Sequence, residues 1–302
     1  MGFLDKIKKR LFCLSFWAFA AIFGVGSGCG RKNVENKRSG IPLSATNGFC
    51  LKVVNGIEQP DIPAVVMLLT ATRDALCTGT FIGDNVVLTA AHCMNSSPTG
   101  GMGLKDGTMP VRMVHGGVVG KEAPKARPMA DLALLIFPPG TSRSWRKISS
   151  LPPKAGDLMT IAGFGQTDFV NDNDPDGRVR YGFNFVDSVD QIQGVLKYES
   201  PKSTNGLRKG QEAMSGRGDS GGPIISGDGL VALTSGGDFD ATTLFEEDLY
   251  LFSQNALDAL EAAQAAGGNI NGVNHVRAAL GKPIKDGELD SDNVPKNLTP
   301  CS

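Results

Sequence analysis

Short apolar runs separated by turn-forming residues dominate the middle of the chain. The runs are rich in valine, leucine, isoleucine and methionine and cover 64–69, 85–88, 132–137, 159–163 and 229–234. Runs of this length, bounded by glycine, proline, asparagine and serine, are typical of β-strands. The chain holds 39 glycines and 17 prolines to form the turns. The pattern therefore predicts an all-β protein made of short strands.

One stretch near the C-terminus has a helical period instead. Within residues 254–266, Ala256, Leu260 and Ala263 recur at spacings of three and four, and two glycines end the run at 267 and 268. This spacing predicts one helix that follows the strands, and a second, short helix is expected near residues 275–280.

The N-terminus has the pattern of an export signal. Basic residues between positions 6 and 10 precede an apolar stretch over 11–28 that ends in small residues. We therefore assign residues 1–28 to a signal peptide. Cys29 follows directly and resembles the lipidated cysteine of a bacterial lipoprotein signal. Ordinary cleavage nearby, giving a soluble secreted protein, and an uncleaved membrane anchor are the alternatives.

These N-terminal features predict a bacterial protein that is secreted across the inner membrane. Lipidation of Cys29 would anchor it at the outer membrane or the cell surface, and otherwise it would be periplasmic or extracellular. Residues 29–52 are polar and serve as a linker and pro-segment.

Composition narrows the class of protein further. The chain is 41% hydrophobic and 20% charged, which is typical of a globular protein. Its formal net charge of −1 gives no electrostatic reason to expect nucleic acid as a partner.

Three motifs carry side chains suited to nucleophilic catalysis. Residues 88–93 read LTAAHC, 129–135 read MADLALL and 216–223 read GRGDSGGP. A serine hydroxyl needs a base that takes its proton during attack, and an imidazole titrates near neutral pH. The imidazole in turn needs a carboxylate that fixes its tautomer. Ser220, His92 and Asp131 are the candidates for these roles.

The three segments, in this order, resemble the active-site segments of the chymotrypsin/trypsin-like serine proteases. The resemblance covers residues 53–266 and implies two packed six-stranded antiparallel β-barrels followed by a C-terminal helix. Residues 267–302 form a C-terminal extension beyond it. The resemblance implies a Ser220–His92–Asp131 triad, with the N–H groups of Gly218 and Ser220 as the oxyanion hole.

Further roles follow from the same resemblance. The hydroxyl of Ser235 would contact Asp131, and the backbone of Ser235 and Gly237 would pair with an extended substrate. No cofactor or metal is needed, the substrates are proteins or peptides, and we expect a monomer. The acidic stretch 172–177 begins like a calcium loop, but Phe183 stands where the loop requires glutamate, so a solvated loop is expected.

The segment CLKVVNG at 50–56 resembles the family's zymogen cleavage site. An activating protease would cut between Lys52 and Val53, and the new ammonium of Val53 would pair with the Asp219 carboxylate. An unpaired buried carboxylate is costly, so this pairing would order the oxyanion hole and the specificity pocket. Alternatively, Lys52 and Val53 simply begin a strand.

Four cysteines remain outside the signal and the lipidation position. The resemblance implies a disulfide between Cys77 and Cys93 that braces the histidine loop. By elimination Cys50 pairs with Cys301, or both stay free.

The specificity pocket departs from the family's pattern. Met214 stands where trypsin-type enzymes carry the aspartate that binds lysine or arginine. Asp248, on the segment that forms the other wall, is one candidate for attracting a basic side chain. An apolar pocket floored by Met214 is the alternative.

The sequence thus predicts a secreted serine endopeptidase that acts through an acyl-enzyme and is made as a zymogen. The alternatives are a catalytically silent relative that binds protein through the same cleft, and an esterase that uses the same triad.

Overall fold

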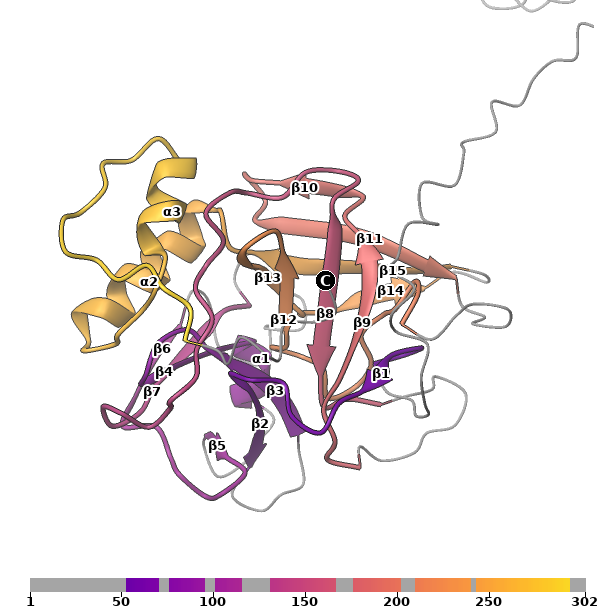
Figure 1. Cartoon of the computed structure of the whole chain (residues 1–302), viewed down its shortest axis with the longest axis horizontal. Coiled ribbons are helices and arrows are strands. Elements are labelled where there is room, and N and C mark those ends of the chain that lie inside the picture. Colours follow the sequence, from indigo (N-terminus) through magenta and orange to yellow (C-terminus); the bar gives the residue numbers. More distant parts are fainter. Residues whose placement is uncertain are drawn as a thin grey trace, which may run out of the picture. The chain divides into compact units, whose positions relative to one another are not determined.

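The computed structural model describes residues 53–70, 76–95, 101–115, 131–166, 176–201, 210–239 and 243–293, and every structural statement below concerns these residues (Figure 1). The strands are β1 (Ile57–Glu58), β2 (Val65–Thr70), β3 (Leu76–Phe81), β4 (Val86–Thr89), β5 (Met102–Leu104), β6 (Arg112–His115), β7 (Ala133–Ile136), β8 (Leu158–Gly163), β9 (Arg180–Phe185), β10 (Ser188–Asp190), β11 (Val195–Pro201), β12 (Pro223–Ser226), β13 (Gly229–Leu233), β14 (Gly237–Phe239) and β15 (Thr243–Tyr250). The helices are α1 (Ala91–Asn95), α2 (Gln254–Ala265) and α3 (Val273–Ala279).

The first sheet is antiparallel and has the order β5-β2-β3-β4-β7-β6. Its central strands β4 and β7 are buried along their whole length. Both come from continuous apolar runs without alternation, which is the pattern of a strand covered on both faces. Figure 1 shows this sheet in purple, with α2 packed beside β6 and β7 and α3 next to α2.

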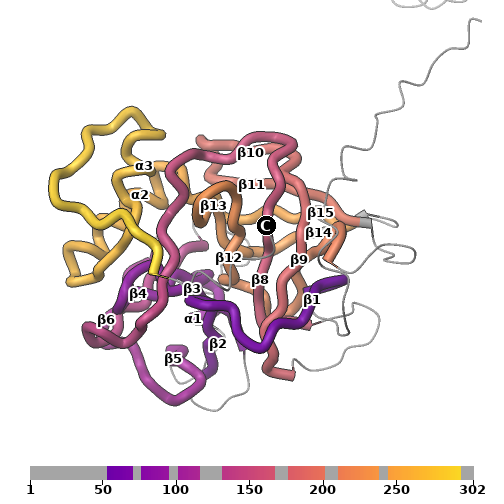
Figure 2. The backbone as a smooth tube through the Cα atoms, viewed as in Figure 1, coloured from indigo at the N-terminus to yellow at the C-terminus, as the bar shows by residue number. Residues whose placement is uncertain are grey.

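The second sheet is also antiparallel and follows the order β1-β9-β8-β12-β13-β15-β11-β10, with β14 paired to β15. The side-chain amide of Asn184 in β9 donates to the Glu199 carbonyl oxygen in β11 at 3.1 Å, which links strands that are far apart in this order. The sheet therefore curls toward closure. In Figure 2 the indigo β1 lies beside β9, where the first described residues join the second sheet.

The prediction of an all-β, trypsin-like fold with two curled sheets and a C-terminal helix is confirmed. Among the described residues the first sheet has the expected six strands. The second has nine, because the short strands β1, β10 and β14 add to its edges.

Helix α2 begins where the sequence pattern predicted. Ser253 caps it, since its hydroxyl accepts from the Ala256 N–H, and satisfying such an N–H stabilises a helix start. The apolar positions of α2, including Leu257 and Leu260, are buried. Helix α3 forms close to the expected residues 275–280.

The described part of the C-terminal extension, residues 267–293, packs onto the connector between β7 and β8. The Ile148 N–H donates to the Asn271 carbonyl oxygen, and Trp145 and Asn293 exchange two backbone hydrogen bonds. Arg277 is almost fully buried and pairs with Glu261 and Glu288. This segment is thus part of the folded unit rather than a free tail.

Candidate active site

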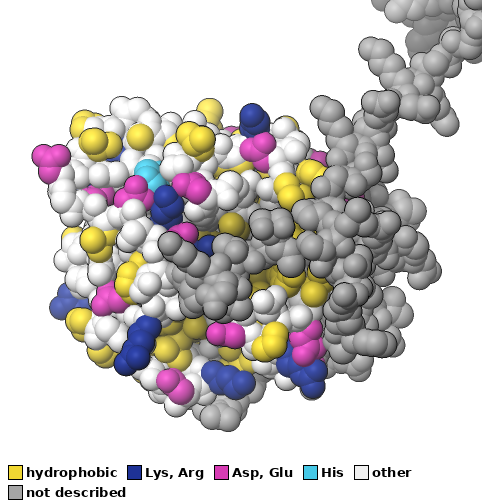
Figure 3. Space-filling view, viewed as in Figure 1, with side chains coloured by type: hydrophobic (Ala, Val, Ile, Leu, Met, Phe, Trp, Pro, Cys, Tyr) yellow, Lys and Arg dark blue, Asp and Glu magenta, His cyan; other side chains and the backbone are white. Residues whose placement is uncertain are grey.

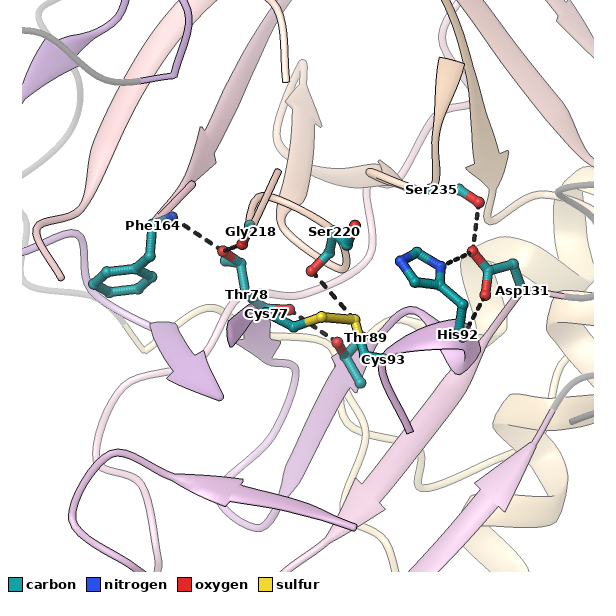
Figure 4. Close-up of a disulfide and its surroundings, with 10 residues drawn as sticks. All are labelled: Cys77, Thr78, Thr89, His92, Cys93, Asp131, Phe164, Gly218, Ser220 and Ser235. Carbon is teal, nitrogen blue, oxygen red and sulfur yellow. Dashed lines mark hydrogen bonds and ion pairs between the residues drawn. A yellow bond between two sulfur atoms is a disulfide. The ribbon is translucent and has the colours of Figure 1, made fainter. Parts of the chain in front are cut away.

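A disulfide holds the short helix that carries His92. Cys77 in β3 is bonded to Cys93 in α1, with the Cα atoms 6.2 Å apart. Cys93 adjoins His92, so the bridge ties the short helix that carries the histidine to the first sheet. The Cys93 sulfur also lies 3.7 Å from the Ser220 carbonyl oxygen (Figure 4).

Asp131 holds His92 through two hydrogen bonds. The His92 backbone N–H donates to Asp131 Oδ1 at 2.8 Å, and His92 Nδ1 lies 2.7 Å from Asp131 Oδ2. The Ser235 hydroxyl donates to Asp131 Oδ2 at 2.5 Å. Asp131 is 6% exposed and lies two residues before the buried strand β7, so its carboxylate is held in a fixed place.

The segment with Ser220 approaches His92 from the second sheet. Figure 4 shows the His92 ring between Asp131 and Ser220, with the other ring nitrogen facing the serine. The Thr78 N–H donates to the Ser220 carbonyl oxygen at 2.9 Å. The Thr78 hydroxyl donates to the Gly218 carbonyl oxygen at 2.9 Å, so β3 positions the serine segment at two points.

The backbone around Ser220 requires glycine. Gly218 has φ 99° and Gly221 has φ 81°, which L-amino acids with side chains rarely adopt. A Cβ on Gly221 would lie 2.1 Å from the Thr89 hydroxyl oxygen. Among the described residues the N–H groups of Gly218 and Ser220 donate no hydrogen bond to the protein, which leaves them available for a ligand.

Asp219 lies fully buried beneath this turn. Its carboxylate accepts from the Gly165 N–H at 2.7 Å and from the Gly216 N–H at 2.8 Å. Burial raises the pKa of Asp219 to about 7, and these two N–H groups oppose the shift. Glycine is needed at 165, because a Cβ there would lie 2.5 Å from the Asp219 carboxyl carbon.

Val53, the first described residue, lies inside the protein. It is 0% exposed and has φ 53°, a strained backbone for a β-branched residue. The next residue, Val54, exchanges two backbone hydrogen bonds with Met214, at 3.0 and 3.3 Å. Met214 lies two residues before Gly216, which binds Asp219.

Comparison with known proteins accounts for this arrangement. The sequence profile of the trypsin family matches residues 53–257. The chain belongs to the trypsin family. Family membership makes it a serine-type endopeptidase that acts on protein substrates.

Individual relatives in this family are distant. Trypsin epsilon of Drosophila erecta is 29% identical over 200 residues, which cover 62% of this chain and 77% of that protein. Kallikrein-4 of Homo sapiens is 27% identical over 215 residues, 66% of this chain and 82% of its own. These relatives are animal proteins and give no support to a bacterial origin.

Among solved structures, neuropsin, a serine protease expressed in the limbic system of mouse brain, superposes with a TM-score of 0.51. The match covers 70% of this chain and 99% of neuropsin, at 19% identity. At this identity the likeness supports the trypsin-like fold.

The two pocket residues predicted from the sequence, Met214 and Asp248, are both buried. Met214 is only 3% exposed. Asp248 is fully buried, and its Oδ1 accepts from the Ser235 N–H at 2.8 Å. The residue opposite Gly237 in the β14–β15 pair is Glu246, whose carboxylate is hydrogen-bonded to the Ser215 hydroxyl.

Sequence reasoning missed Glu246 and Ser215. The register of β15 against β14 decides which acid faces Gly237, and the hairpin loop between these strands hides that register in the sequence. The sequence did contain one indication of this. Glu246 and Asp248 are two residues apart in one strand, so their side chains lie on the same face.

The metal-binding potential of the site is limited. Ligand atoms of Cys77, His92 and Cys93 lie within 4.8 Å of one another. Both sulfurs are joined in the disulfide, however, and metal ligation requires thiolates. This trio therefore does not form a metal site in the oxidised protein.

Several predictions fall outside the described residues. They concern the signal peptide at 1–28, Cys29, Lys52, the Cys50–Cys301 pair and the start of the acidic loop at 172. No helix among the described residues is long and apolar enough to span a membrane.

Proposed function

We propose that the protein hydrolyses peptide bonds with Ser220 as nucleophile, His92 as general base and Asp131 as the residue that orients His92. The observation that carries this proposal is the set of bonds on Asp131. Two come from the backbone and ring of His92 and one from Ser235. They hold one ring nitrogen of His92 and leave the other facing Ser220.

The proton transfers follow from this geometry. Asp131 Oδ2 accepts the proton on His92 Nδ1, so Nε2 carries a lone pair. His92 Nε2 takes the Ser220 proton as the hydroxyl oxygen attacks the substrate carbonyl. The imidazolium then gives that proton to the leaving amine, and water releases the acyl group from Ser220 by the same steps in reverse.

The N–H groups of Gly218 and Ser220 bind the oxygen that becomes negative in the tetrahedral intermediate. Neither group is used within the described protein. Loss of one such donor costs about 10²–10³ in turnover. The exposed backbone at Gly236 and Gly237, next to Ser235, offers an edge on which an extended peptide can lie.

Activation proceeds by cleavage between Lys52 and Val53. The new ammonium pairs with Asp219, whose buried carboxylate accepts from two N–H groups and forms no ion pair with a cation of the described residues. Val53 is already buried, and its strained φ relaxes once the preceding peptide bond is cut.

The remaining assignments rest on the sequence alone. Residues 1–28 direct export and residues 29–52 form a linker and pro-segment. Cys29 is the lipidation site, which would hold the enzyme at a membrane surface. The protease domain spans 53–266, and the enzyme acts as a monomer outside the cell without a cofactor.

The triad is tested by active-site labelling. The protein is cut at Lys52, N-terminal sequencing verifies Val53 as the new end, and a fluorophosphonate probe is added. We expect the probe on Ser220 in the cut protein, and none in the Ser220→Ala variant or in uncut Lys52→Gln protein.

The outcomes separate the rival functions. A folded, correctly cut protein that stays unlabelled would support a silent, protein-binding relative. Labelling with turnover of esters but not of peptide amides would support an esterase. Labelling of uncut Lys52→Gln protein at the full rate would rule out the zymogen mechanism while leaving the triad intact.

A further inference from the structure

Two buried acids on β15 share one face behind the substrate edge. Glu246 and Asp248 occupy alternate positions of the strand and are 4% and 0% exposed. Glu247 between them points outward, is exposed and pairs with Lys197. The two inward acids therefore face the interior of the second sheet together.

Each acid leaves one oxygen without a partner. Glu246 is bonded to Ser215 through Oε1, and Asp248 is bonded to the Ser235 N–H through Oδ1. Glu246 Oε2 and Asp248 Oδ2 are buried and make no hydrogen bond among the described residues. Buried polar atoms are nearly always satisfied, so these oxygens point to a missing ligand.

A third unpartnered group lies on the neighbouring strand. Tyr198 in β11 is directly opposite Glu246, is 1% exposed, and its hydroxyl also makes no hydrogen bond within the described residues. Both acids act electrostatically on this hydroxyl. The Tyr198 hydroxyl is therefore a third polar group without a partner in the same buried region.

The Glu246 carboxylate lies close to the exposed backbone at Gly237. A Cβ built on Gly237 would be 3.0 Å from Glu246 Oε2, so this oxygen lies directly behind the exposed substrate edge. Ser215, from the segment after Met214, binds the other oxygen. The Glu246 carboxyl group therefore spans these two chain segments.

The charge of this interior is unbalanced. Among the described residues no lysine, arginine or histidine pairs with Glu246 or Asp248. Arg180, the cation that acts on Asp219, forms its own ion pairs with Glu58 and Asp176. On the face in Figure 3, by contrast, acidic and basic side chains are interspersed. A buried carboxylate is stable only when a cation or a proton compensates it.

We propose that Glu246, with Ser215, determines specificity by binding the ammonium or guanidinium of a lysine or arginine directly before the cut bond. The proposal rests on the proposed endopeptidase function. It gives to Glu246 the role that the sequence suggested for Asp248, whose Oδ1 is already bonded to the Ser235 N–H. The bound cation would satisfy Glu246 Oε2, which has no partner otherwise.

The binding of a cation here depends on pH. Burial raises the pKa of Glu246 to about 8, the Ser215 hydrogen bond opposes this, and Asp219 adds to it. The groups that face Glu246 are Asp248, Tyr198 and Ser215, and burial raises the pKa of Asp248 as well. Glu246 is therefore mostly protonated at pH 7 and ionised at pH 9, so preference for a cation grows as pH rises.

The test compares two substrates on protein cut at Lys52. They are matched peptides with arginine or leucine before the cut bond, and their kcat/KM ratio is measured from pH 6.5 to pH 9. We expect the arginine-to-leucine ratio to rise about tenfold between pH 7 and pH 9. Glu246→Gln should lower the ratio at pH 9 about a hundredfold and remove its pH dependence. Glu247→Gln, next in the strand and exposed, is the matched control and should leave both unchanged.

A binding measurement separates this proposal from the proposed function. Benzamidine is titrated into the cut Ser220→Ala protein, with and without Glu246→Gln, by calorimetry. We expect benzamidine to bind only when Glu246 is present, even if the protein hydrolyses nothing. Equal ratios in wild type and Glu246→Gln, or benzamidine affinity unchanged by Glu246→Gln, would overturn the proposal. A preference for small neutral residues before the cut bond would also overturn the proposal, since Glu246 would then only restrict the size of the side chain that fits.

Discussion

The buried acids of the candidate active site differ in how many of their oxygens accept hydrogen bonds. Asp131 is surrounded by three donors from His92 and Ser235. Glu246 and Asp248 each keep an oxygen without a partner among the described residues. Both oxygens of Asp131 therefore have donors within the described residues, whereas a ligand would have to satisfy the second oxygen of Glu246 under our proposal.

Asp219 stands between these two cases. Its carboxylate has two backbone donors, yet burial still raises its pKa to about 7. Hydrogen bonds alone therefore do not offset its loss of hydration. Cleavage would supply a cation from the chain itself, while the pocket obtains one from the substrate.

The largest effect is expected when the Asp131 carboxylate, which accepts hydrogen bonds from His92, is replaced by an amide. Asp131→Asn would place an amide against His92 Nδ1, so the ring would carry its proton on Nε2 and could not accept from Ser220. We expect kcat to fall about 10⁴-fold. Steady-state hydrolysis of a peptide amide measures this, and Asp258→Asn on the exposed face of α2 is the control. A loss below tenfold would contradict the role of Asp131.

The stability of the uncut protein should depend on pH through the buried carboxyl group of Asp219. Its pKa of about 7 in the uncut fold lies above the ordinary aspartate pKa of about 3.9, so the folded state binds more protons between these two values. Stability of the uncut protein should therefore fall as pH rises. We expect this carboxyl group to cost about 3 kcal/mol between pH 5 and pH 8.

Urea unfolding of the Lys52→Gln precursor, with and without Asp219→Asn, isolates this contribution, because other acids act equally in both proteins. After cutting at Lys52, the ammonium of Val53 should remove the loss of stability or reverse it. Identical pH profiles for the two precursors would show that Asp219 is already compensated before cleavage.

Removing the disulfide tests whether substrate preference depends on the histidine helix that the disulfide braces. Replacing Cys77 and Cys93 by alanine frees a loop with a sequence separation of 16 and should cost about 3 kcal/mol of stability. Because the bridge braces α1, kcat should also fall. The arginine-to-leucine ratio should stay the same, since the pocket belongs to the second sheet. A changed ratio would show that substrate preference depends on α1.

The smallest effect is expected where one of several partners is lost. Ser235→Ala removes one hydrogen bond from Asp131 but keeps both bonds to His92. A hydrogen bond to a charged group contributes about 1.5 kcal/mol or more, so kcat should fall at least about tenfold. Ser226→Ala, which removes a hydroxyl bonded to the Leu158 carbonyl oxygen, is the control.

The sequence predicted best what depends on local pattern. The apolar runs at 85–88 and 132–137 became the buried strands β4 and β7, and the helical period became α2. The structure also brings together His92 and Asp131 from two of the three motifs, and their role in catalysis stays a prediction.

Register and long-range contacts could not be predicted in the same way. Whether Glu246 or Asp248 lies opposite Gly237 depends on the length and path of the hairpin loop, and a shift of two residues keeps both acids on the same face. The packing of the C-terminal extension depends on backbone hydrogen bonds of Asn271 and Asn293, which leave no periodic pattern.

That packing bears on how the protein is made. Residues 269–293 leave the ribosome after every strand of both sheets, yet their backbone bonds to Trp145 and Ile148 complete the connector between the sheets. Domains fold as their residues emerge during synthesis. An unfinished chain therefore lacks the backbone hydrogen bonds that Asn271 and Asn293 make with the connector between β7 and β8. A C-terminal truncation before Asn271 would remove these bonds while leaving every described strand in the chain.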